Sequence, residues 1–103
     1  MANEGYHESI DELSDETRDM HRAITSLMEE LEAIDWYNQR VDACQSAELK
    51  AILAHNRDEE KEHAAMVLEW IRRRDPTFDD ELRDYLFTDD EIAHEHDDEQ
   101  DHE

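Results

Sequence analysis

Glu60 and His63 are the residues of this sequence whose types and spacing most clearly suggest chemistry. They form a Glu-x-x-His motif, and residues three apart in an α-helix share one face, so both side chains can bind one metal ion. Both continue an apolar 3-4 stripe, in which Asn56, Glu60 and His63 take three successive inward positions. An inward carboxylate needs a partner, because burying an unpaired charge is unfavourable. The alternative interpretation is a pair of surface side chains beside the stripe.

A second group of acidic residues lies in the preceding segment. Glu30 falls on the flank of another apolar stripe, three residues after Leu27, and Tyr37 follows two turns later on the same side. Glu29 and Glu32 are close by. Position alone does not choose among the three glutamates, and a solvated acidic face is the other interpretation.

Together the two segments supply half of a di-iron carboxylate site. In a four-helix bundle, such a site takes one Glu from each of two helices and one Glu-x-x-His from each of the other two. Two copies of this chain would supply four Glu and two His, and the charge of four carboxylates would balance two Fe²⁺ ions. Oxygen ligands with few imidazoles suit iron or manganese better than zinc, whose structural sites favour thiolates.

Two long helices must position these residues. The first is predicted from Ser9 to Asp42, with Ser9 as N-cap and Glu12 three residues on, as in a capping box. Its apolar stripe consists of Ile10, Leu13, Met20, Ile24, Leu27, Leu31, Ile34 and Val41, with Thr17 and Asn38 in the two gaps. The second helix is predicted over 47–74, capped by Ser46.

A short third helix is predicted to follow. Asp75-Pro76 ends the second helix, because the residue before a proline avoids the helical conformation. Thr77 is the predicted cap of the third helix, which runs to Phe87. The short connection between the long helices favours an antiparallel arrangement. The predicted fold class is all-α: an antiparallel two-helix hairpin plus a short third helix, completing a four-helix bundle by dimerisation.

The composition limits the partners and the core. The chain has 103 residues, of which 32 are acidic and 10 basic, giving a formal net charge of −22. This charge argues against nucleic acid and anionic membranes as partners, since both require a basic surface. No apolar run is long enough to span a bilayer. Few large aliphatic residues predict a fold that self-association completes.

One domain is predicted over 9–88. We expect a disordered N-terminus at 1–8 and an acidic disordered tail at 89–103, where like charges dominate. The first residues show no basic segment followed by an apolar one, so no secretory signal is predicted. The single cysteine, Cys44, fits a reducing compartment, and we expect a cytoplasmic location.

Several blocks of this sequence closely resemble the encapsulated ferritins of bacteria and archaea. They are EELEAIDWYNQRVDA at 29–43, ILAHNRDEEKEHAAMVLEW at 52–70, HRAI at 21–24 and RDYLFT at 83–88. The resemblance implies a ferritin-like bundle formed by two protomers, with five such dimers in an annular decamer. It also implies ferroxidase activity and mineral storage inside an encapsulin shell, in the lumen of that nanocompartment.

The resemblance also implies roles for particular residues. The family's di-iron ligands, which hold two iron ions per dimer, fall on Glu30, Glu60 and His63. Its residues beside the centre fall on Trp36 and Tyr37. Its acidic entrance site falls on Glu29 and Glu32. Its secondary metal site, for which we expect calcium, falls on His55, Glu59 and Glu62. For that last group, an ordinary solvated face is the alternative.

The leading hypothesis is a ferroxidase that oxidises Fe²⁺ with oxygen or peroxide. The main alternative is a non-catalytic helical oligomer in which the same Glu and His residues hold a structural divalent ion. A metal-free acidic adaptor would have to tolerate polar residues in the apolar stripe without an ion. A hemerythrin-like oxygen carrier needs more core histidines than His63 and the off-phase His55 provide.

Overall fold

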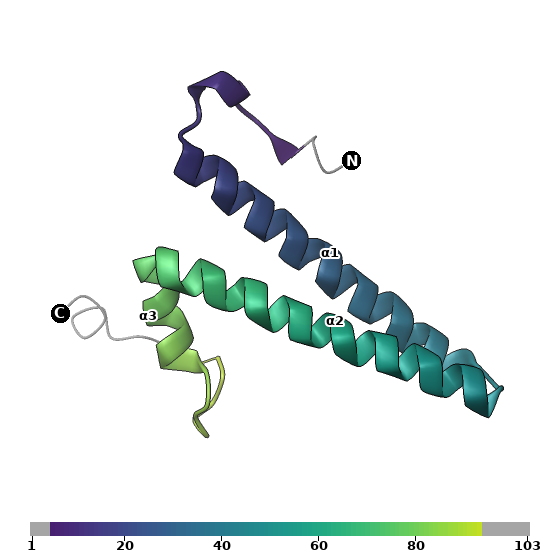
Figure 1. The fold of residues 1–103 in the computed structure, drawn as a ribbon. Helices are drawn as coiled ribbons and strands as arrows, with labels where there is room; N and C mark the ends of the chain where they lie inside the picture. The colour runs from purple at the N-terminus through teal and green to yellow at the C-terminus, as the bar shows by residue number, and fades with distance from the viewer. Residues whose placement is uncertain (1–4, 94–103) are drawn as a thin grey trace.

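The computed structural model describes residues 5–93, and within that range every regular element is helical (Figure 1). A 3-10 turn at Ile10–Glu12 precedes three α-helices: α1 at Asp15–Ala43, α2 at Ala47–Arg74 and α3 at Pro76–Tyr85. The predicted all-α class is confirmed. The predicted segment 1–8 lies partly, and the tail 89–103 largely, outside the described residues, and the predicted domain bounds remain a prediction.

The start of α1 differs from the predicted start at Ser9. Ser14 is the actual N-cap, and its side-chain oxygen accepts a hydrogen bond from the Thr17 N–H at 3.1 Å. Ser9 makes no such bond, and Leu13 is extended, which separates the 3-10 turn from α1. Arg18 holds the turn in place by donating two hydrogen bonds to the Ile10 carbonyl, at 2.7 and 3.1 Å. The earlier serine therefore starts a separate turn.

The helices α1 and α2 form an antiparallel hairpin, joined by a three-residue connection (Figure 1). Ser46 caps α2 as predicted, accepting a hydrogen bond from the Leu49 N–H at 3.3 Å. The end of α2 at Arg74 also agrees with the prediction. The hairpin thus brings the segment of Glu30 alongside the segment of Glu60 and His63.

One chain buries very little. Among residues 5–93, only Ala64 and Ile71 are buried apolar residues. Large apolar side chains remain exposed on both long helices, namely Ile24, Met28, Leu31, Trp36, Leu49, Ile52 and Met66. So many exposed large apolar side chains on two packed helices favour an interaction face.

The cap of α3 is Asp75 and not, as predicted, Thr77. The Asp75 carboxylate accepts a hydrogen bond from the Phe78 N–H at 2.9 Å, and Pro76 takes the first helical position, where its missing N–H does no harm. The helix ends at Tyr85, before the predicted end at Phe87, because Leu86 is extended and Phe87 has a φ of 61°.

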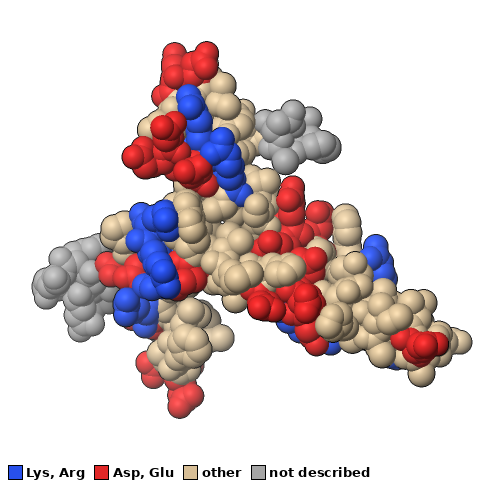
Figure 2. Space-filling model, in the orientation of Figure 1, with Lys and Arg blue, Asp and Glu red and all other residues tan. Residues whose placement is uncertain are grey.

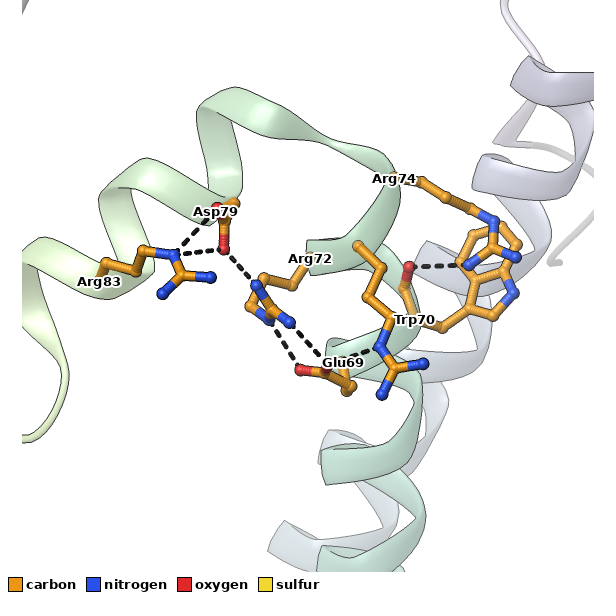
Figure 3. Close-up of polar contacts among 7 residues, drawn as sticks. Glu69, Trp70, Arg72, Arg74, Asp79 and Arg83 are labelled. Atoms are coloured by element: carbon orange, nitrogen blue, oxygen red, sulfur yellow. Dashed lines mark hydrogen bonds and ion pairs between the residues drawn. The ribbon is translucent and has the colours of Figure 1, made fainter.

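A chain of ion pairs fixes α3 to the end of α2 (Figure 3). Arg72 donates two hydrogen bonds to the Glu69 carboxylate, at 2.7 and 2.8 Å, and a further one to Asp79 of α3. Arg83 donates to both oxygens of Asp79 at 3.0 Å. Arg72 therefore links an acid of α2 to an acid of α3, which holds the short helix at a fixed angle.

These ion pairs predict a defined pH dependence. The hydrogen bonds from Arg72 lower the pKa of Glu69 to about 2, and Arg72 likewise lowers the pKa of Asp79. A lowered pKa stabilises the folded state above the unfolded-state pKa, and this stabilisation is lost as the pH falls toward the folded-state value.

We therefore expect wild type to be more stable than Glu69→Gln above about pH 5, and the difference to vanish as the pH approaches about 2. Urea unfolding followed by circular dichroism at several pH values measures this difference. Asp80→Asn, which removes an exposed carboxylate of α3, is the matched control. A difference that is independent of pH would contradict the prediction.

Candidate metal centre

Glu60 and His63 lie together on α2, and both are partly exposed. The His63 Nδ1 and Glu60 Oε1 atoms are 3.6 Å apart, and the two side chains are 44% and 28% exposed. That separation is longer than a hydrogen bond, so neither side chain is locked to the other. Both retain lone pairs that a shared cation can use.

Glu30 is the least exposed of the neighbouring glutamates Glu29, Glu30 and Glu32 on α1. Glu29 and Glu32 are exposed, whereas Glu30 is half-buried. Its Oε1 atom is inaccessible to solvent and accepts no hydrogen bond from any described residue. A buried carboxylate oxygen without a donor is unfavourable, so a positive partner would stabilise it. The structure thus separates Glu30 from its two neighbours, which sequence position could not do.

The register of the hairpin sets Glu30 near the Glu-x-x-His motif. The Arg57 Nη1 donates a hydrogen bond to the Asn38 Oδ1 at 3.0 Å, which aligns these two residues across the hairpin. Glu30 lies eight residues before Asn38, and the residues eight beyond Arg57 reach Ala65, just past His63. The antiparallel helices therefore carry all three predicted ligands within about two turns of one another.

One chain does not complete a metal site on its own. Within the described part of the chain, no three His, Cys, Asp or Glu side chains come close enough together to hold an ion. Glu60 and His63 are brought together, but Glu30 is not drawn to them. The exposed apolar side chains Leu49, Ile52 and Met66 flank the pair along α2.

Trp36 and Tyr37 occupy different environments. Trp36 is 49% exposed. Tyr37 is half-buried, and the Arg40 guanidinium lies 5.2 Å from the centroid of its ring. That stacking restrains the tyrosine ring on the flank of α1 that also carries Glu30.

The predicted outer sites are exposed. His55 Nε2 and Glu59 Oε2 are 3.6 Å apart, with side chains 70% and 51% exposed, and Glu62 is exposed one turn further along α2. Figure 2 shows acidic side chains gathered over the middle of the hairpin and basic ones near the junction of α2 and α3. The acidic surface raises the local concentration of cations.

Sequence reasoning missed the bond between Asn38 and Arg57. The sequence signals this bond only through Asn38, a polar residue at a position of the first apolar stripe where a hydrophobic residue is expected. The partner could not be identified without the register of the two helices. The stacking of Arg40 on Tyr37 was also missed, although Arg40 lies three residues further along α1.

A helical hairpin with a half-buried Glu on one helix and a Glu-x-x-His on the other matches the half-unit of a ferritin-like carboxylate bundle. Comparison with known proteins agrees with this class. The sequence model of the EncFtn-like family matches residues 5–89. The chain therefore belongs to the EncFtn-like family.

Relatives and a solved structure support this membership. The chain is 64% identical over 87 residues to an encapsulated ferritin-like protein of Rhodospirillum rubrum, which covers 84% of this chain and 62% of that protein. It is 51% identical over 47 residues to an encapsulin nanocompartment cargo protein of Myxococcus xanthus, covering 46% of this chain and 36% of that protein.

A crystal structure of a Nitrosomonas europaea protein superimposes with a TM-score of 0.84 at 78% identity, covering 87% of this chain and 99% of that one. The hairpin architecture is therefore shared with an experimentally determined structure. In the described range, none of the helices is long and apolar enough to cross a membrane.

Proposed function

We propose that this chain is a ferroxidase, which oxidises Fe²⁺ to Fe³⁺ at a di-iron centre formed between two copies of the chain. Membership of the EncFtn-like family supports a ferritin-like role. The relatives named as an encapsulated ferritin-like protein and as an encapsulin cargo support an encapsulin shell as partner, and the lumen of that compartment as location.

The observation that carries the proposal is the buried, unpartnered Oε1 atom of Glu30. The register marked by the bond between Arg57 and Asn38 leaves Glu30 within about two turns of Glu60 and His63 along the hairpin. A cation bound between two copies would give this oxygen a partner. The second copy of the chain would also cover the apolar side chains that flank the motif. Dimerisation around a bound cation would thus both neutralise the Glu30 carboxylate and bury the exposed apolar side chains.

The charges of the shared site favour the oxidised product. Two copies contribute the carboxylates of Glu30 and Glu60 twice, a charge of −4 that balances two Fe²⁺ substrate ions. Oxidation adds one positive charge per ion, and the surrounding carboxylates stabilise that increase. The two electrons, with two protons, reduce O2 to H2O2 or H2O2 to two waters. The His63 imidazoles add neutral ligands.

The surrounding residues have supporting roles in this proposal. Glu29 and Glu32 attract Fe²⁺ toward the centre as the entrance site, because they add exposed negative charge beside Glu30. Tyr37 hydrogen-bonds a ligand carboxylate and fixes its orientation, while Trp36 packs beside the centre. His55, Glu59 and Glu62, which do not converge on one point in the single chain, are the proposed ligands of a secondary site for calcium, which prefers carboxylate oxygens. In the assembled protein, dimers close into an annular decamer.

Anaerobic titration of the metal-free protein with Fe²⁺, followed by native mass spectrometry, tests the shared centre. We expect one iron per chain, present only in dimers or larger even assemblies. Admission of oxygen should then give rapid oxidation. Iron bound equally by monomers would contradict a shared site. Stoichiometric binding without oxidation would instead assign the residues to a structural, non-catalytic metal site.

A further inference from the structure

We infer that the hydrogen bond between Asn38 and Arg57 is a positioning element, which sets the register of α1 against α2 and thereby the level of Glu30 relative to Glu60 and His63. The inference rests on the proposed function, because it concerns the geometry of that centre. It assigns a role to two residues that are not ligands in the proposal.

The bond is part of a short polar chain that begins on α1 and continues along α2. Arg57, whose side chain is 22% exposed, donates Nη1 to Asn38 Oδ1 at 3.0 Å and Nε to Asp58 Oδ1 at 3.1 Å. Asp58 is also 3.4 Å from the Lys61 Nζ. Asp58 therefore contacts both cations, and its hydrogen bond with Nε helps to hold the guanidinium of Arg57 in the orientation that reaches Asn38.

The apolar stripe of α2 is interrupted where the proposed ligands lie. Asn56, Glu60 and His63 occupy successive positions of the α2 stripe, and none of them is fully buried. Apolar contacts are non-directional, so a stripe interrupted in this way defines the register poorly. A directional bond between a guanidinium and an amide oxygen is satisfied in one register.

A shift in the register of α1 against α2 would displace Glu30 by much more than metal coordination tolerates. A slip of one helical turn would move α1 by about 5.4 Å along α2. Metal–ligand distances tolerate only about 0.2 Å. A carboxylate displaced by a turn could no longer share an ion with His63. Arg57 lies one turn before Glu60, and such a slip would break its hydrogen bond to Asn38.

Asn38→Leu tests the inference, because leucine has a similar size but no acceptor oxygen. Anaerobic Co²⁺ is the probe, since its visible spectrum reports coordination without turnover. We expect Asn38→Leu to retain helix content and to bind Co²⁺ about tenfold more weakly, with an altered spectrum. Asn38→Asp, which keeps the acceptor, should restore both. Arg57→Leu is the second variant that breaks the bond, in case Asn38→Leu does not fold.

The matched control is Gln39→Leu, which removes the neighbouring amide, whose hydrogen bond to Asp35 stays within α1. It should bind Co²⁺ as wild type does. If Asn38→Leu bound Co²⁺ with the wild-type affinity and spectrum, the positioning role would be overturned and the proposed function would stand. Failure of the wild type to bind one Co²⁺ per chain would instead overturn the proposed function, and the positioning role with it.

Discussion

Glu60→Ala is expected to lower the initial rate of Fe²⁺ oxidation by at least about 100-fold, while the helix content stays unchanged. The reason is that Glu60 is the only proposed ligand that the structure pairs with His63, at 3.6 Å, and removing it deletes two carboxylates from each shared site. Losing an outer-shell partner already reduces activity about 10- to 100-fold at metal sites, so losing a ligand should exceed that range. Stopped-flow absorbance with Fe²⁺ and oxygen measures the rate.

The control for this variant is Glu48→Gln, which removes a carboxylate from the exposed start of the same helix. It should oxidise Fe²⁺ at close to the wild-type rate. Circular dichroism of both variants separates loss of chemistry from loss of fold. An active Glu60→Ala protein would rule out the proposed centre, whatever its affinity for iron.

Ile52→Lys is expected to separate the proposed dimer into monomers and to abolish oxidation with it. Ile52 is 53% exposed in one chain and lies on the same stripe of α2 as His63. Burial of such a side chain contributes about 1.5–3 kcal/mol, and a two-fold interface loses that contribution twice. The dissociation constant should therefore rise by about 100-fold or more. Analytical ultracentrifugation at several protein concentrations measures it.

Met66→Lys, a change at the other end of the motif where Met66 is 58% exposed, should act in the same way. Ile92→Lys is the control, because Ile92 is 81% exposed and lies beyond α3. It should leave the assembly unchanged. Dimers that persist in both Ile52→Lys and Met66→Lys would show that this face does not form the interface.

The sequence predicted the features that depend on local spacing. The pairing of Glu60 with His63 follows from the helical repeat, and Ser46 caps α2 because its side-chain oxygen accepts a hydrogen bond from the Leu49 N–H three residues on. The predicted start of α1 at Ser9 was wrong because Ser9 and Ser14 offer the same capping chemistry. The choice between them depends on Leu13, whose extended backbone isolates the first turn.

Features that depend on the relative placement of helices were not predictable from spacing. The cap of the third helix is a different case, because it is local: Pro76 takes the first helical position, so the cap is Asp75, and the prediction of Thr77 overlooked this. The partner of Asn38 required the register of the hairpin. The burial of Glu30, but not of Glu29 or Glu32, required the path of α2 across α1.

The near absence of a core in the single chain, with only Ala64 and Ile71 buried in the described range, has a consequence for how the protein responds to dilution. If most apolar surface is covered only by other copies, folding and association form one equilibrium governed by mass action. The melting temperature then rises with protein concentration. In that case a newly synthesised chain would gain its full stability only on association with other copies, and the local concentration of the chain would set the amount of folded protein.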